Sequence, residues 1–113
     1  MAARNPLLNA PPYPVEQALK RLGANLRTAR LRRNLTIKDV AQKIGSGPRA
    51  VMDAEKGKPS TGIAVYVALL WVFDLLSPFS EVADPAMDSE GQTLARSRER
   101  SRARVGGGLD DDF

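Results

Sequence analysis

The chain has 113 residues, of which 42% are hydrophobic but only 5% aromatic; this fits one small domain with an aliphatic core plus some tail, rather than two packed domains. It contains no cysteine and no histidine, which excludes disulfides and thiol catalysis and removes the commonest metal ligand and general base. Seventeen Lys and Arg residues against thirteen Asp and Glu give a net charge of +4, a balance that favours an anionic partner, with nucleic acid first.

Residues 1–14 hold one charged residue, Arg4, and a proline-rich stretch at 11–14. They lack the apolar segment of a secretory signal, so we expect a flexible arm and a cytoplasmic protein. The longest apolar run, residues 63–73, has eleven residues, fewer than the roughly 18 that a membrane-spanning helix needs. We expect a core or interface helix there.

Apolar residues within 15–33 recur at intervals of three and four, which predicts one amphipathic helix. The stripe consists of Val15, Leu19, Leu22, Leu26 and Ala29.

A second, short helix is predicted to open at Thr36, because Asp39 three residues later is typical of a loose capping box. Gly45 suits the left-handed position that ends this helix. Ser46 is expected to cap a third helix over 47–56, with Pro48 in its first turn, where proline is tolerated. A tight turn containing glycine therefore joins the two short helices.

A fourth helix is predicted from residue 61 or 62 to about residue 76, where Ser77 and Pro78 end it. Residues 79–83 are expected to form one more turn, and Asp84 to cap a last helix that reaches about Arg104. The expected organisation is a flexible arm, a helix-turn-helix domain, an arginine-rich extension and a flexible acidic tail, over residues 1–14, 15–83, 84–105 and 106–113.

A basic helix followed by two short helices and a glycine-containing turn is the pattern of a helix-turn-helix, whose second short helix enters the DNA major groove. The run from Leu35 to Gly45, followed by Val51 and then by Glu55 to Ser60, has the skeleton "LT…VA..IG……V…EKGKPS". It resembles the lambda-repressor-like (XRE) family of helix-turn-helix regulators over about residues 19–75. The resemblance implies an all-α fold, a compact domain of four to five helices with a C-terminal extension.

The resemblance also implies a partly buried ion pair between Arg30 and Glu55, which would hold the third helix in place; two separate surface charges are the alternative. Arg49 is the best candidate for base readout, since an arginine can reach two acceptors on guanine; a phosphate contact or a solvated side chain is equally open. The residues that the resemblance assigns to DNA contact are Thr36, Ile37, Lys38, Ser46, Gly47, Pro48, Arg49, Ala50, Asp53, Lys56 and Lys58.

Three of these residues depart from the family pattern. Gly47 and Pro48 stand where polar side chains are common, and proline has no N–H to donate. Asp53 would be repelled by phosphates unless it accepts a hydrogen bond from a cytosine amino group. We therefore expect sparse direct readout and a larger contribution from DNA shape.

The fourth helix is apolar nearly all round, and such a helix must be buried on more than one side. We expect a homodimer interface there, which would also supply two recognition helices for half-sites roughly 34 Å apart. The alternative is that the last helix folds back over this face. The residues expected in the interface are Val65, Ala68, Trp71, Val72, Leu75, Leu76 and Phe79.

Residues 83–92 and the arginines that follow resemble the C-terminal region of HipB-type antitoxins, which neutralise HipA-type serine/threonine kinase toxins and repress their own operon. Five arginines occupy every second position from 96 to 104, which spreads them around a helix and disfavours membrane binding. DNA phosphates, an acidic patch on a partner and plain solvent are the open alternatives. In the tail, Leu109 and Phe113 are expected to dock into a partner, unless the tail only improves solubility.

Charge is separated along the chain. Residues 1–34 carry seven basic residues and one acidic residue, whereas residues 60–92 carry five acidic residues and no basic one. This indicates two working surfaces.

The leading hypothesis is therefore a dimeric, sequence-specific DNA-binding repressor that acts as the antitoxin of a HipA-type kinase toxin and autoregulates its operon, associated with the bacterial nucleoid. A stand-alone XRE-family regulator is the closest alternative, and a protein-only interaction module with the same fold is the third. No enzyme, metal or cofactor is expected, because the serines lack a histidine partner and the three terminal aspartates are contiguous on a flexible tail.

Overall fold

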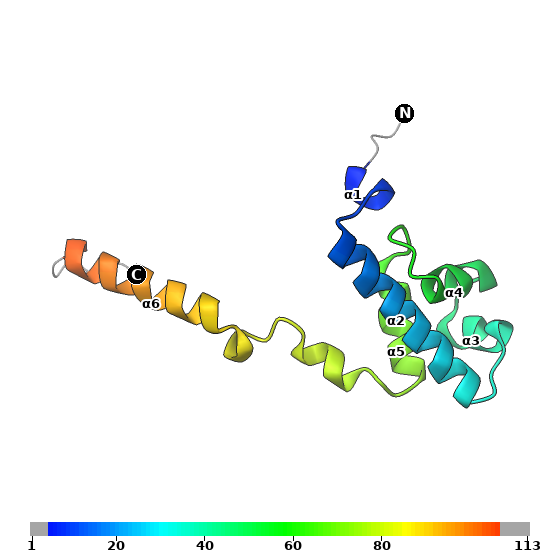
Figure 1. Ribbon diagram of the computed structural model, residues 1–113. Coiled ribbons are helices and arrows are strands. Elements are labelled where there is room, and N and C mark those ends of the chain that lie inside the picture. The colour runs from blue at the N-terminus through cyan, green and yellow to red at the C-terminus, as the bar shows by residue number, and fades with distance from the viewer. Residues whose placement is uncertain (1–4, 107–113) are drawn as a thin grey trace. The chain divides into compact units, whose positions relative to one another are not determined.

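The structure is a computed structural model, and it describes residues 5–106 of the chain. These residues are all-helical, with no strand among them (Figure 1). The elements in chain order are α1 (Pro6–Asn9), α2 (Tyr13–Arg32), α3 (Ile37–Ile44), α4 (Pro48–Glu55), α5 (Ile63–Val72), the 3-10 helices η1 (Ser77–Glu81) and η2 (Pro85–Met87), and α6 (Ser89–Gly106).

The chain divides into two compact units, residues 1–79 and 80–113. The division falls inside η1, slightly before the boundary after residue 83 that the sequence indicated. The first unit contains both short helices of the predicted helix-turn-helix, and the second contains the arginine-rich segment.

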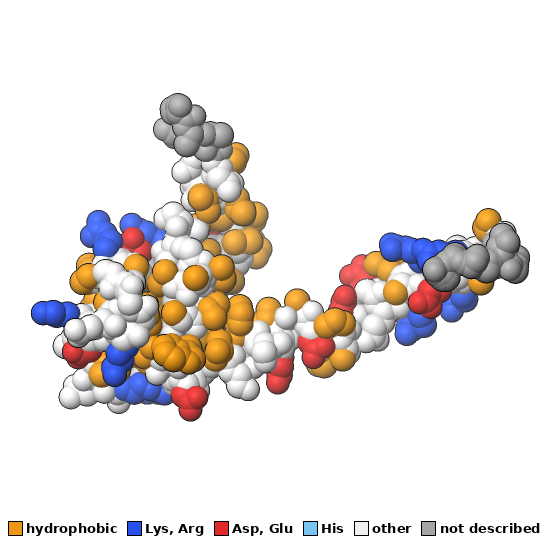
Figure 2. Space-filling model, turned by 180° about the vertical axis from the view of Figure 1, so that it is seen from behind, with side chains coloured by type: hydrophobic (Ala, Val, Ile, Leu, Met, Phe, Trp, Pro, Cys, Tyr) orange, Lys and Arg blue, Asp and Glu red, His pale blue; other side chains and the backbone are white. Residues whose placement is uncertain are grey.

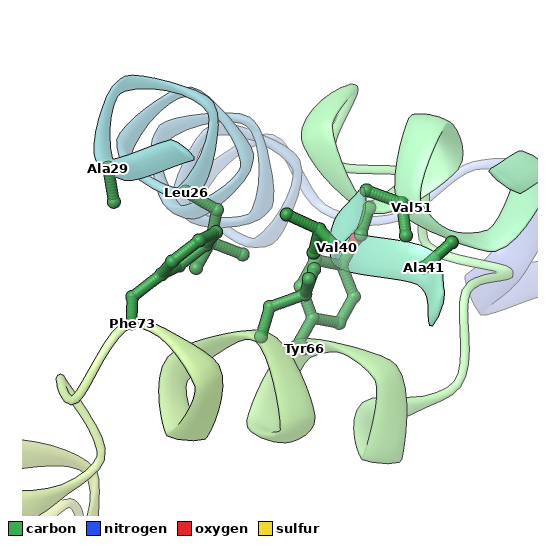
Figure 3. Packing of buried hydrophobic residues seen from close by; sticks show 9 residues of the cluster. Leu26, Ala29, Val40, Ala41, Val51, Tyr66 and Phe73 are labelled. Atoms are coloured by element: carbon green, nitrogen blue, oxygen red, sulfur yellow. The ribbon is translucent and has the colours of Figure 1, made fainter. Parts of the chain in front are cut away.

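Helices α2 to α5 pack around one core. α4 contacts α2, α3 and α5, and α3 also contacts α5. Phe73 lies against Leu26, and Tyr66 lies beside Val40 (Figure 3), so two aromatic rings fill much of the space between α5 and the helices that face it. Among residues 5–106, the buried apolar residues are Leu26, Ala29, Val40, Ala41, Val51, Ala54, Tyr66, Leu69 and Phe73.

The start of α3 is fixed by the capping box that the sequence predicts. The Thr36 hydroxyl oxygen accepts a hydrogen bond from the Asp39 backbone N–H at 3.0 Å, and the Asp39 carboxylate accepts one from the Thr36 backbone N–H at 2.9 Å. These two bonds satisfy N–H groups that have no partner within the helix. The hydrogen bond from the Thr36 backbone also lowers the pKa of Asp39 below its usual value, because it favours the charged carboxylate.

At Gly23, the backbone of α2 lies close to the end of α4. A Cβ at this position would lie 2.5 Å from the Ala54 carbonyl oxygen and 2.6 Å from the Glu55 carbonyl oxygen. Only a residue without a side chain fits there, because both neighbours are backbone atoms. This contact was not predicted from the sequence.

Within residues 5–14, the short helix α1 and the start of α2 were not predicted from the sequence. The Asn5 side chain accepts a hydrogen bond from the Leu7 backbone N–H at 3.0 Å and Pro6 occupies the first turn of α1, an arrangement that favours a helix start. α2 then begins at Tyr13 rather than at Val15. Val15 is exposed and lies outside the core.

The C-terminal boundaries also differ from those predicted. α5 ends at Val72, before the predicted residue 76, because Asp74 adopts a left-handed backbone conformation with φ 61° and the Leu75 N–H bonds back to the Leu70 carbonyl. Asp84 caps η2 and not a long helix. α6 begins at Ser89, where the Asp88 carboxylate accepts a hydrogen bond from the Gly91 N–H at 3.0 Å.

Candidate nucleic-acid interface

The helix-turn-helix geometry follows from the turn between α3 and α4. Gly45 ends α3 in the left-handed conformation that the sequence predicts, with φ 75°, and the Ser46 N–H donates to the Ala41 carbonyl at 2.9 Å. The prediction that Ser46 caps α4 is wrong. Gly47 holds the N-cap position, directly before Pro48, and the Ser46 hydroxyl donates to the Gly47 carbonyl instead.

Arg30 and Glu55 form the expected ion pair, and its geometry is bidentate. Arg30 Nε lies 2.6 Å from Glu55 Oε2, and Arg30 Nη2 lies 3.0 Å from Glu55 Oε1. The two side chains are only 9% and 8% exposed, and the hydrogen bond to Glu55 raises the pKa of Arg30. Arg30 also donates to the Leu35 carbonyl at 2.9 Å. One guanidinium therefore joins α2, the segment before α3 and the end of α4.

Arg33 has a comparable role that was not predicted from the sequence. It donates to the Ala29 carbonyl and to the Phe73 carbonyl, both at 2.9 Å, and its guanidinium lies 5.4 Å from the centre of the Phe73 ring. It therefore ties the end of α2 to the end of α5. Its sequence position in a basic run carries no signal of this contact.

The outward face of α4 presents a cation, an apolar side chain and a second cation in helical register. Arg49, Met52 and Lys56 are exposed and lie three and four residues apart, while Val51 and Ala54 on the opposite face are buried. Met52 was not predicted as a contact residue from the sequence, although its spacing from Arg49 was a usable signal. An apolar side chain at this position can contact the methyl group of thymine.

Asp53 lies between the cations of this surface. Its Oδ1 atom is 3.4 Å from Lys58 Nζ and 3.8 Å from Arg49 Nε, and its side chain is 22% exposed. The structure therefore gives Asp53 two cationic neighbours and offsets part of the phosphate repulsion that the sequence suggested. A contact with a cytosine amino group would compete with these cations.

The loop after α4 is held by Tyr66. The Tyr66 hydroxyl donates to the Lys58 carbonyl at 2.9 Å, and burial raises the pKa of Tyr66, so this hydroxyl keeps its proton at neutral pH. The Lys56 and Lys58 side chains are both exposed, and Lys58 also pairs with Asp53.

The other residues assigned to DNA contact divide by exposure. Thr36, Lys38, Gly47 and Pro48 are exposed, and Ser46 and Ala50 are half-buried. Ile37 packs against the core, so it is badly placed to touch a base. Among the residues assigned to DNA contact, Lys38 is therefore the exposed cation at the start of α3.

The surface expected to form a dimer is apolar and accessible. Trp71 is 62% exposed, and Leu75 and Phe79 are also exposed. Ile63, which is not among the predicted interface residues, is exposed to nearly the same degree as Trp71. Figure 2 shows hydrophobic side chains gathered over this side of the first unit. The remaining predicted interface residues, Val65, Ala68, Val72 and Leu76, are half-buried.

Two further properties concern residues 5–106 alone. Their acidic side chains form no group of three or more that could hold a metal ion. None of their helices combines the length and apolar character required to cross a membrane. Leu109 and Phe113, assigned to partner binding, lie outside the described residues.

Comparisons with known proteins give no further guide. No family model, curated protein or solved structure matches the chain.

Proposed function

We propose that the chain is a dimeric, sequence-specific DNA-binding transcriptional repressor in which α4 enters the major groove. The observation that carries the proposal is the exposed face of α4, with Arg49, Met52 and Lys56 in register, on a helix whose C-terminal end is held by the buried pair of Arg30 and Glu55. A recognition helix needs this combination of a fixed position and an outward face with both hydrogen-bond donors and apolar atoms.

Lys38 and Lys58 complete the interface as phosphate contacts. Phosphate contacts set the register of a protein on DNA, whereas base contacts give specificity. Arg49 is the one long donor near the start of α4, where recognition helices touch base edges. The Asp53 carboxylate near it lowers the local positive charge, which reduces binding to any DNA through phosphates alone.

Arg49→Ala tests this assignment. We expect the variant to lose about 1–3 kcal/mol of discrimination between an operator and unrelated DNA, because a bidentate guanine contact contributes that much. The operator is obtained by letting the full chain select from a random duplex library, and affinities for both DNAs are measured by fluorescence anisotropy. Arg27→Ala, at an exposed arginine of α2, is the control. An equal loss on both DNAs would refute base readout.

The resemblance adds a second role, that of antitoxin to a HipA-type kinase toxin with autoregulation of the operon. We keep this role as a proposal for the second unit, with a stand-alone XRE-family regulator as the alternative. Affinity purification of the full chain from its native host, followed by mass spectrometry, separates the two. A co-purifying serine/threonine kinase supports the antitoxin; operator binding with no protein partner favours the stand-alone regulator.

A further inference from the structure

α6 carries arginines on two opposite sides. Arg96, Arg100 and Arg104 are spaced four residues apart, and so are Arg98 and Arg102. At about 100° per residue, each set forms a stripe along the helix, and the two stripes lie about 180° apart. Figure 2 shows basic side chains along both edges of this helix. We call the set of three the first stripe and the pair the second stripe.

Both stripes are available to a partner. Residues 92–105 are all exposed, and within the described part of the chain none of the five arginines belongs to an ion pair. Like charges four residues apart oppose helix formation. An anionic partner that contacts both stripes would remove this repulsion on both sides of the helix.

We propose that α6 is a second DNA-binding element, which lies in the major groove of duplex DNA with one stripe toward each phosphate wall. The major groove of B-form DNA is about 12 Å wide and an α-helix with side chains is about 10–12 Å across, so the helix fits between two rows of phosphates. The deep major groove of duplex RNA is too narrow for this arrangement.

An acidic protein surface fits these residues less well. A surface on one side of the helix neutralises one stripe and leaves the other in solvent. The apolar side chains that anchor protein contacts are also sparse here: Leu94 and Val105 are the exposed large hydrophobic residues of α6, and they lie eleven positions apart. The helix therefore offers no apolar seam to a partner or to a second copy.

The proposal concerns α6 alone and does not depend on α4 contacting DNA. The test uses the full chain, a 24-bp DNA duplex of random sequence, and the salt dependence of binding measured by fluorescence anisotropy. Each lost phosphate contact lowers the salt slope by about 0.9. We expect R96Q/R100Q/R104Q to lower the slope by up to about 2.7, and R98Q/R102Q by up to about 1.8. Glutamine has nearly the helix propensity of arginine, and far-UV circular dichroism checks that α6 keeps its helix.

R21Q/R27Q is the matched control, because it removes two exposed arginines from α2. It should change the salt slope by less than the value of one phosphate contact, which is about 0.9. The proposal would be overturned if only one of the two stripe variants lowered the salt slope, or if neither did. It would also be overturned if the control variant lowered the slope as much as the stripe variants. Equal or tighter binding of duplex RNA or polyglutamate would overturn it as well. If Arg49→Ala leaves binding to both operator and random DNA unchanged while both stripes lower the slope, the role of α4 fails and that of α6 stands.

Discussion

Arg30 illustrates how one side chain holds α4, the helix proposed to enter the major groove. Its guanidinium holds Glu55 through two hydrogen bonds and the Leu35 carbonyl through a third. Both partners of the ion pair are almost fully buried. A buried pair contributes little relative to apolar residues of the same size, but removal of one partner leaves an uncompensated charge.

Glu55→Ala should therefore destabilise the protein by roughly 3–5 kcal/mol, because the Arg30 charge stays buried without its carboxylate. Urea denaturation followed by circular dichroism measures this loss. The double variant R30M/E55L should recover much of it, since neither charge is then left alone. A loss below about 1 kcal/mol, which is typical of exposed pairs, would show that Glu55 does not hold α4 in this way.

The contact between α2 and α4 decides stability at the scale of elements. Gly23→Ala would improve helix propensity in α2 by about 1 kcal/mol in an open position. Here the new Cβ would lie 2.5 Å from the Ala54 carbonyl oxygen, so we expect a net destabilisation of about 1–3 kcal/mol from overpacking. Thermal and urea unfolding measure whether the substitution lowers or raises the stability of the protein.

Ala24→Gly at the neighbouring exposed position provides the comparison. It should cost about 1 kcal/mol, the ordinary penalty of glycine in a helix. If Gly23→Ala instead stabilises the protein, the close approach of the two helices does not exist in solution.

The capping box makes the start of α3 sensitive to acid. The pKa of Asp39 is lowered from its ordinary value of 3.8, so its contribution is fully present above about pH 3.8 and disappears as the pH falls through the lower, folded-state value. We expect Asp39→Asn to be less stable than the wild type at pH 7, with the difference shrinking below about pH 4. Urea titrations at several pH values measure it.

Glu81→Gln removes a carboxylate outside α3 and is the control for that series. It should leave the contribution of Asp39 in place. A constant stability difference between wild type and Asp39→Asn from pH 7 to pH 2 would contradict the assignment of the pH dependence to this cap.

At the scale of the whole molecule, the surface proposed to contact DNA and the exposed apolar surface lie on different helices, α4 and α5. The outward face of α4 carries two cations around Met52, whereas α5 and the residues after it expose Ile63, Trp71, Leu75 and Phe79. An exposed apolar surface of this kind favours burial against a partner, and a second copy would place two α4 helices on one DNA site.

Trp71→Glu tests whether that partner is a second copy. A charge at this position should shift the protein toward monomers in sedimentation velocity and weaken operator binding in parallel, because buried charge opposes association. Met87→Glu, at an exposed apolar residue of the second unit, should change neither property. If the Trp71→Glu variant is still a dimer, α5 does not form the dimer interface.

Several features of the fold and the site could be predicted from local sequence. The capping residues Thr36 and Asp39, the left-handed Gly45 and the apolar spacing of Leu26 and Ala29 each act within one or two helical turns, and the structure contains all of them. The ion pair of Arg30 and Glu55 could be predicted only through a family resemblance, because the two residues are far apart in the sequence.

The sequence by itself determined the all-helical class, the order of the short helices and their turn, since these depend on spacing and capping between near neighbours. Only the tertiary structure decided that Gly23 must lack a side chain, that Arg33 caps α5 and that Asp53 lies between Arg49 and Lys58. It also decided that Gly47 and not Ser46 occupies the N-cap of α4. Most of these features depend on how helices approach one another, and distance along a chain does not encode distance between packed helices.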